Sequence, residues 1–552
     1  MYQYALADNE LLNSRTNQFK DQISRRIDGS LSEDEFRPLR LMNGLYLEMH
    51  AYMLRIAIPY GVLSSNQLHK LADVSDRFDR GYGHFTTRQN IQLNWIELDQ
   101  ASDILSHLSD ANLHAIQSSG NCIRSVTADP YAGAGADEVA DPRPTAELIR
   151  QWSCLHPEFA FLGRKFKIAV TGSEHDRASI RVHDIGVQLV RNEAGEAGYK
   201  LFVGGGLGRT PMVGKVLSEF LPENELLAYL EAALRVYNLD GRRDNKYKAR
   251  IKILTRDLGV NNLRERIDAE YNGCRSQLPD TSNWLRHVES QFKLPTFDDA
   301  SSDAAVYVTD SNPITDKSLA RWIKTNVISH RVDGYSIVNI SLKPVNGIPG
   351  DVTSEQMHLL ADLAKRFSSD EIRVTKNQNL VLPHVKTKDL TALYDILKRH
   401  SLAEANHGLL TDVVSCPGMD YCSLATARSI PIAQEISQRF ADPETQDLVG
   451  KIAIKISGCI NACGHHHIGQ IGILGLEKGG KEYYQLVLGG DDSEFATIGK
   501  VTGPGFSSEE IVDAVATVID VYLELRLEDE LFVDTQRRLG SKPFKEVLYA
   551  TH

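Results

Sequence analysis

The chain lacks the long apolar segments of a membrane protein. Its 552 residues contain no run of eighteen or more apolar residues, so we expect no membrane-spanning helix. The first ten residues have neither a basic start nor an apolar core, so we expect no secretory signal. Asp and Glu outnumber Lys and Arg, 73 to 61, and the net charge is −12. An acidic chain is a poor ligand for nucleic acid, and we expect a cytoplasmic protein with no nucleic-acid or membrane partner.

A complete dinucleotide-binding motif is also missing. Gly204 and Gly206 follow a predicted strand, but Arg209 stands where the fingerprint needs its last glycine. Thr210-Pro211 predicts the start of a helix, and a helix N-terminus can bind an anion. Glycines that only allow a turn are an equally good explanation.

Cysteine is scarce, but four of the seven cysteines lie in one window of 48 residues. Cys416 and Cys422 form a C-x5-C pair, and Cys459 and Cys463 form a C-x3-C pair. Clustered thiolates in a reduced protein most simply hold a metal or an iron–sulfur cluster. Structural zinc usually has C-x2-4-C pairs, and the C-x5-C pair lies outside that range. Two disulfides would need an oxidising compartment. Four free thiols packed in the core remain the alternative without a ligand.

The sequence repeats itself. Gln67–Asp73 matches Gln356–Asp362 at an interval of 289 residues. Lys165–Gly172 matches Lys451–Gly458 at 286. The order of matches is the same in both halves, so we predict two copies of one unit.

The first copy begins with a β-helix-β pattern. Residues 53–59 and 84–95 alternate like strands, and residues 66–78 have helical periodicity after Ser64-Ser65. We predict an α+β or α/β fold with an internally duplicated, ferredoxin-like half-domain and pseudo-twofold symmetry. The predicted divisions are a helical arm (1–40), a half-domain (41–115), a larger domain (116–280), a linker (281–310), a second half-domain (311–403) and a last domain (404–552).

The cysteine motif carries a family resemblance. C-x5-C followed by Gly458-Cys459-Ile-Asn461-Ala-Cys463-Gly resembles the signature of the sirohaem and [4Fe-4S] sulfite/nitrite reductases. The resemblance implies that Cys416, Cys422, Cys459 and Cys463 bind the cluster and that Cys463 also bridges to the sirohaem iron. It implies that domain 116–280 binds sirohaem and carries the anion-binding residues, and that domain 404–552 binds both the sirohaem and the [4Fe-4S] cluster.

Three arginines of the first half acquire a role only through this resemblance. By pattern alone, Arg55 and Arg88 are solvated side chains of half-buried strands, and Arg124 is an arginine in a loop. Arg55 and Arg124 match the two anion-binding arginines of the family. Thr87-Arg88-Gln89 resembles its T-R-Q motif, which lies along the sirohaem. In a strand over 84–95, Thr87 and Gln89 would face one side and Arg88 the other.

Two lysines point to the substrate. Lys165 and Lys167 stand two apart in a predicted strand, so both project to one face, as a solvated edge pair also would. In the family, Lys-x-Lys here is typical of sulfite reductases, whereas nitrite reductases more often have Asn at the second position. The resemblance also implies cofactor contacts by Arg164, Gly205, Gly206 and Asn461.

Two further motifs stay open. Residues 245–259 are predicted to form a basic amphipathic helix. Its basic face could be solvated, could lie against an acidic cofactor or electron donor, or could bind nucleic acid, and the solvated face is favoured. The three histidines at 465–467 could bind a metal, but packing and hydrogen-bonding roles are favoured.

The resemblance implies a sulfite reductase haemoprotein that makes sulfide with six electrons and the two cofactors sirohaem and [4Fe-4S]. Without a flavin or nicotinamide motif, electrons must come from ferredoxin or a flavoprotein reductase subunit. Two alternatives stay open: a nitrite reductase that makes ammonia, and a non-enzymatic binding protein structured by zinc.

Overall fold

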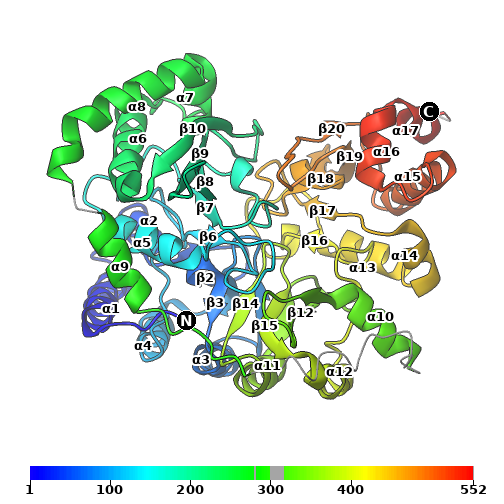
Figure 1. Cartoon of the computed structure of the whole chain (residues 1–552), viewed down its shortest axis with the longest axis horizontal. Helices are drawn as coiled ribbons and strands as arrows, with labels where there is room; N and C mark the ends of the chain where they lie inside the picture. The colour runs from blue at the N-terminus through cyan, green and yellow to red at the C-terminus, as the bar shows by residue number, and fades with distance from the viewer. Residues whose placement is uncertain (279–280, 299–315, 551–552) are drawn as a thin grey trace.

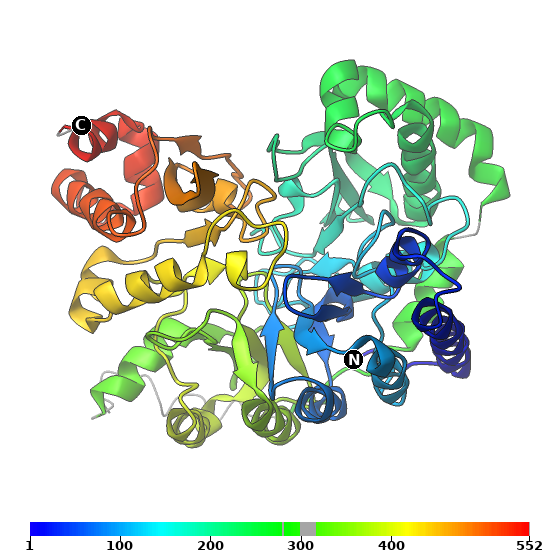
Figure 2. The same ribbon diagram turned by 180° about the vertical axis from the view of Figure 1, so that it is seen from behind.

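Four sheets of five strands each form the framework of the described residues. The structure is a computed structural model that describes residues 1–278, 281–298 and 316–550. Two antiparallel sheets lie side by side at the lower centre of Figure 1, and two mixed sheets lie above them on the left and right. Figure 2 shows the same arrangement from behind.

The two antiparallel sheets exchange a strand. The first has the order β1-β2-β5-β4-β13 and the second β11-β12-β15-β14-β3. Thus β13 comes from the second half and pairs with β4, while β3 comes from the first half and pairs with β14. This reciprocal exchange joins the two half-domains into one core. The strands are β1 (Leu45–Leu47), β2 (Tyr52–Ile56), β3 (Val62–Leu63), β4 (Tyr82–Phe85), β5 (Ile91–Ile96), β11 (Val327–Ser329), β12 (Tyr335–Ile340), β13 (Asp351–Thr353), β14 (Ile372–Val374) and β15 (Leu380–Lys386).

The two mixed sheets share one topology. In each, the first three strands are parallel and the last two antiparallel, and the orders are β6-β7-β8-β9-β10 and β16-β17-β18-β19-β20. The predicted internal duplication and the α+β class are therefore confirmed. The strands are β6 (Thr127–Ala128), β7 (Ile168–Thr171), β8 (Ile185–Arg191), β9 (Ala197–Val203), β10 (Lys215–Pro222), β16 (Val414–Ser415), β17 (Ile454–Ser457), β18 (Ile471–Lys478), β19 (Lys481–Leu488) and β20 (Lys500–Val501).

Helices cover the outer faces of the sheets. Among the described residues, none of these helices is both long and apolar enough to cross a bilayer. They are α1 (Leu6–Ile27), α2 (Glu33–Met42), α3 (Ser65–Phe78), α4 (Ala101–Ser109), α5 (Arg143–Ser153), α6 (Leu226–Asp240), α7 (Ile251–Leu258), α8 (Val260–Cys274), α9 (Thr281–Ser290), α10 (Lys317–Asn326), α11 (Ser354–Phe367), α12 (Leu390–Arg399), α13 (Ile430–Arg439), α14 (Pro443–Val449), α15 (Ile511–Leu525), α16 (Phe532–Leu539) and α17 (Lys542–Leu548). Helix α9 lies in the predicted linker, whose residues 299–310 fall outside the described residues.

The repeated Gln-x-His-x-Leu-Ala-Asp motif lies on α3 and α11. Each helix begins with a capping box. The hydroxyl of Ser64 or Thr353 accepts a hydrogen bond from the backbone N–H of the motif's glutamine, Gln67 or Gln356. The two helices pack together, and Nδ1 of His69 lies 2.8 Å from Nδ1 of His358. Each histidine also faces the aspartate of the other helix, Asp362 or Asp73. The motif therefore marks the pseudo-twofold axis.

The strand predicted over residues 84–95 is wrong in its middle. The chain forms β4, a turn and β5, because Thr86 closes a turn with its carbonyl and hydroxyl. Gln89 takes a left-handed conformation at φ 55°. The T-R-Q motif is thus a hairpin turn, and its side chains do not alternate as in a strand.

The helix predicted from Thr210 is also absent from this part of the described chain. After β9 the chain forms a loop and then returns as β10. Two hydrogen bonds close the loop, because the backbone N–H of Gly206 donates to the Met212 carbonyl and that of Met212 donates to the Gly206 carbonyl. The Thr-Pro pair predicts a helix start from local sequence alone, but the antiparallel pairing of β10 with β9 determines the structure here.

One glutamine from each half crosses to the other. The Gln89 amide donates to the carbonyls of Ala128 (2.8 Å) and Val374 (3.0 Å), and its oxygen accepts from the Ala128 N–H. Gln378 donates to the Phe85 carbonyl and accepts from the Ser415 N–H. These buried side-chain amides therefore provide hydrogen-bond partners for backbone groups at the ends of strands in both halves.

We expect Gln89→Leu to destabilise the protein by about 2–4 kcal/mol, because it leaves the Ala128 and Val374 backbone groups without their partner. Gln438→Leu, at an exposed position of α13, is the matched control and should change little. Urea unfolding followed by fluorescence measures both; equal midpoints would contradict the role of the crossing amide.

Candidate functional site

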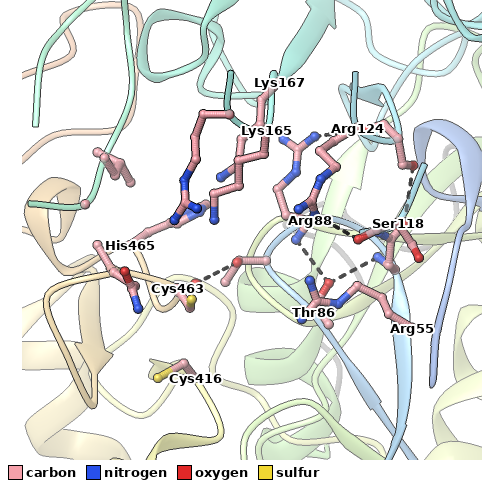
Figure 3. A pocket seen from close by; sticks show the side chains of 18 of the residues that line it. Arg55, Thr86, Arg88, Ser118, Arg124, Lys165, Lys167, Cys416, Cys463 and His465 are labelled. Carbon is pink, nitrogen blue, oxygen red and sulfur yellow. Dashed lines mark hydrogen bonds between the residues drawn. The ribbon is translucent and has the colours of Figure 1, made fainter. Parts of the chain in front are cut away.

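A pocket opens to solvent where the two mixed sheets meet the first half-domain. Cationic side chains line one side and the cysteine loop the other (Figure 3). The cations are Arg55, Arg88, Arg124, Arg164, Lys165, Lys167, Arg209, Lys246, Arg250 and Lys252. From the cysteine loop come Cys416, Pro417, Asn461, Ala462, Cys463 and His465.

Two neighbouring segments deliver three of these cations. The Arg124 N–H donates to the Phe166 carbonyl (2.7 Å), and the Phe166 N–H donates to the Cys122 carbonyl (3.0 Å). Because Phe166 is buried, Lys165 and Lys167 on either side of it both project into the pocket, as predicted. They lie in the extended chain just before β7.

The arginines are held by neutral acceptors. Arg55 donates through Nε and Nη2 to Gln92 Oε1 (3.2 and 2.7 Å) and lies over the Tyr46 ring. Arg124 donates to the carbonyls of Gly120 and Ser118, both at 2.9 Å. These contacts orient each guanidinium without cancelling its charge.

Five of the pocket cations have no carboxylate partner among the described residues, whereas Arg250 is paired with Asp184. Within residues 1–278, 281–298 and 316–550, no carboxylate forms an ion pair with Arg55, Arg88, Arg124, Lys165 or Lys167. Burial and then the neighbouring Arg124 lower the pKa of Arg88 to about 9. Burial lowers the pKa of Lys165 to about 8, against the opposing effect of Cys463. Burial and the adjacent Lys165 lower the pKa of Lys167 well below its usual value. Such a site favours a bound anion.

The second half neutralises its own lysines. Lys343 is buried and paired with Asp412 at 2.5 Å. Lys376 and Lys455 both pair with Asp492. Charges that already have partners do not call for an external anion, so the duplicated scaffold keeps one anion site in its first half.

The four-cysteine loop lies against this cation wall. Cys463 is exposed to the pocket and Cys416 also lines it, whereas Cys422 and Cys459 lie behind. Cys416 Sγ accepts from the Gly458 N–H at 3.2 Å. Burial, and then the neighbouring Cys463, raise the pKa of the Cys416 thiol to about 11. Thiols this hard to ionise need a bound cation to become thiolates.

The T-R-Q turn joins the two walls. Thr87 Oγ1 donates to the Cys463 carbonyl at 2.8 Å, so the first half positions the cysteine that faces the pocket. Arg88 lines the pocket, whereas Gln89 does not and instead makes the buried crossing described above. The predicted cofactor contact of Gln89 is therefore not seen.

The glycine-rich loop contributes different residues from those predicted. Leu207, Gly208, Arg209 and Thr210 line the pocket, whereas Gly205 and Gly206 lie outside its lining. A Cβ on Gly205 would lie 2.3 Å from the Arg181 carbonyl oxygen, so this glycine permits close strand packing.

The basic segment 245–259 is not a solvated helix face. Helix α7 starts only at Ile251, and Arg250 and Lys252 are buried in the pocket wall. The Lys252 ammonium donates to the carbonyls of Gly206, Leu207 and Thr210 and thereby holds the glycine-rich loop.

Asp184 is a site residue that the sequence did not reveal. Its carboxylate accepts two hydrogen bonds from Arg250, both at 2.7 Å, and one from the Lys167 N–H at 2.9 Å. It is a lone carboxyl before a strand, and nothing in its sequence neighbourhood distinguishes it from a surface aspartate.

The cysteines are not arranged around a single ion. Among the described residues, no three His, Cys, Asp or Glu side chains converge to hold one metal ion.

Family profiles match both parts of the duplicated fold. The nitrite and sulphite reductase 4Fe-4S domain matches residues 119–275 and 408–551. The nitrite/sulfite reductase ferredoxin-like half domain matches residues 48–111 and 333–400. The chain belongs to the nitrite and sulphite reductase family. It is an oxidoreductase, and its cofactors are sirohaem and a [4Fe-4S] cluster.

Individual relatives include reductases of both anions. "Sulfite reductase [ferredoxin] 1" of Mycolicibacterium paratuberculosis is 28% identical over 538 residues, 95% of this chain and 87% of the relative. "Assimilatory ferredoxin-dependent nitrite reductase" of Haloferax mediterranei is 27% identical over 505 residues, 87% and 81% of the two chains. The solved structure of Mycobacterium tuberculosis NirA protein superposes with a TM-score of 0.77 at 26% identity and covers 98% of both chains.

The pocket residues fit these cofactors. Sirohaem is a polycarboxylate, and the unpaired cations would hold its carboxylates, while the paired loops supply four thiols beside it. Figure 3 shows Cys463 on the side of the pocket that faces Lys165 and Lys167.

We expect Gly464→Ala to abolish cluster binding. A Cβ on Gly464 would lie 1.8 Å from the Ile456 carbonyl oxygen, so the loop that carries Cys463 must move. Gly273→Ala is the matched control, since a Cβ there meets no atom within 4 Å. Iron and acid-labile sulfide analysis decides; normal iron in Gly464→Ala would show that the loop tolerates the shift.

Proposed function

We propose that this enzyme reduces sulfite to sulfide with six electrons. The observation that carries the proposal is the set of half-buried cations without carboxylate partners among the described residues, with Lys165 and Lys167 two residues apart at the wall facing Cys463. The resemblance of this Lys-x-Lys pair to sulfite reductases supports sulfite over nitrite.

Arg55 and Arg124 are proposed to clamp the substrate oxygens. A guanidinium only donates hydrogen bonds and stays charged, so it neutralises a small anion throughout the reaction. Gln92, Tyr46 and the carbonyls of Ser118 and Gly120 hold both groups in place before the substrate arrives. Pre-oriented donors stabilise charge without reorganising at each step.

Lys165 and Lys167 are proposed to deliver protons. Each oxygen of sulfite leaves as water, which takes two protons per S–O bond broken. Burial and neighbouring cations lower the pKa of both ammonium groups, so each Nζ gives up a proton more readily than an ordinary lysine does. Water entering from the open side of the pocket would return it.

The cofactors supply the electrons. When bound, sirohaem and the cluster provide the iron that takes up the substrate and the electron store that reduces it. Cys416, Cys422, Cys459 and Cys463 would hold the cluster, and Cys463 is the one among them that is exposed at the pocket. Thr87, Arg88, Arg164 and Asn461 are proposed to border the sirohaem, consistent with their place in the pocket lining.

Ferredoxin is the proposed electron donor. Relatives of both substrate classes carry "ferredoxin" in their names, which favours it over a flavoprotein reductase subunit. All seven cysteines are free, which is compatible with the reducing cytoplasm, the proposed location.

Nitrite reduction to ammonia is the second candidate. The Haloferax mediterranei relative is almost as similar to this chain as the mycobacterial sulfite reductase is. Since the same cation wall would bind either anion, the ratio of kcat/KM for the two substrates separates them.

We expect Lys167→Asn to lower kcat/KM for sulfite by about a hundredfold, the usual size of a general-acid contribution. The loss for nitrite should be at least tenfold smaller, because Asn is the residue more often found there in nitrite reductases. Steady-state assays with a reduced dye measure both. Lys478→Asn, at an exposed position of β18, is the control. Equal losses for the two anions would contradict the specificity assignment.

We expect the purified protein to contain about four to five irons per chain and little zinc, with a chlorin-type absorption band. Elemental analysis and a visible spectrum test this. A colourless protein loaded with zinc would refute the reductase and favour a binding protein.

A further inference from the structure

Arg88 owes its direction to three acceptors. Its Nη2 donates to the Ser125 carbonyl (2.7 Å), and its Nη1 donates to Thr127 Oγ1 (3.3 Å) and to His183 Nε2 (2.5 Å). Ser125 and Thr127 belong to the segment that leads into β6, whereas His183 comes from the turn before β8. His183 therefore supplies the shortest contact and the only one from that turn.

The protonation of His183 follows from its two contacts. Nδ1 lies 2.8 Å from the Ser179 carbonyl oxygen, which can only accept, so Nδ1 carries the proton. The guanidinium of Arg88 can only donate, so Nε2 must be unprotonated. The ring is thus neutral with one defined tautomer. It is 5% exposed, and burial and then Arg88 lower its pKa well below the usual value.

A neutral acceptor suits this position. A carboxylate here would orient Arg88 as Asp184 orients Arg250, but it would also cancel the charge that faces the pocket. The second half shows that outcome, where Asp492 and Asp412 neutralise the lysines. The imidazole directs the guanidinium and leaves its positive charge for the ligand.

We propose that His183 is a positioning residue that aims Arg88 at a carboxylate of the bound sirohaem. This inference rests on the proposed function, because it takes sirohaem as the occupant of the pocket. The contacts of Arg88 within the protein use Nη1 and Nη2 on one edge, so the position of the whole guanidinium in the pocket lining depends on them.

Two substitutions separate this role from a merely structural one. His183→Gln places an amide oxygen where Nε2 was, so it keeps the acceptor for Arg88 and gives up the bond to Ser179. His183→Asn places an amide nitrogen where Nδ1 was, so it keeps the bond to Ser179 and gives up the acceptor. The readout is the rate of sirohaem loss from the purified holoenzyme in mild denaturant, followed by visible absorbance.

We expect His183→Asn to lose sirohaem about tenfold faster than the wild type and His183→Gln to stay within about twofold of it. In an Arg88→Ala background, His183→Asn should add nothing, because it acts through Arg88. An Asn variant as slow as the wild type, a Gln variant as fast as the Asn variant, or additive effects in the double variant would each overturn the proposal.

A neutron structure of the wild-type holoenzyme tests the same point without any variant. A proton on Nδ1 and none on Nε2 would support the proposal even if the Asn chain fails to fold, and a proton on Nε2 would overturn it. A wild-type chain purified without sirohaem would instead refute the proposed function, and a neutron structure of that chain would still show whether His183 offers Arg88 an unprotonated Nε2.

Discussion

The site depends on positive charge that is half-buried and, among the described residues, left without a carboxylate partner. Arg55, Arg88, Arg124, Lys165 and Lys167 gather at one wall, and burial and mutual proximity lower the pKa of Arg88 and both lysines. Burying unpaired cations costs free energy that the rest of the fold must offset. Two large cores and reciprocal strand exchange supply that stability, and an anionic ligand would recover part of the cost when it binds.

Duplication explains how one chain can carry such a site. Both halves have the same sheet topology, yet in the described residues the first leaves Arg55, Arg88, Arg124, Lys165 and Lys167 without carboxylate partners, whereas the second pairs Lys343 with Asp412 and Lys376 with Asp492. The second half instead holds the cysteine loop. One copy thus provides the anion-binding wall and the other the thiols, and Thr87 connects the two walls through the Cys463 carbonyl.

Neutral acceptors and carboxylates have different tasks around this wall. Gln92, His183 and backbone carbonyls direct the arginines that face the pocket and leave their charge available. Asp184 lies one layer behind, where it holds Arg250 and the Lys167 backbone. The choice of acceptor therefore decides which pocket cations keep their full charge for a ligand and which, like Arg250, share it with a carboxylate.

Local signals in the sequence determined the duplication, the helices α3 and α11 with their capping boxes, and the cysteines of the loop, because each is written in short spacings. They did not determine that T-R-Q is a turn, that Gln89 points away from the pocket, or that Arg250 and Lys252 are buried in its wall. Contacts such as Arg88 with His183, 95 residues apart, and Gln89 with Val374, 285 residues apart, exist only once the sheets have packed. Short spacings in the sequence show which side chains one segment carries. The partner of each charged side chain depends on other segments, which come close only when the core packs.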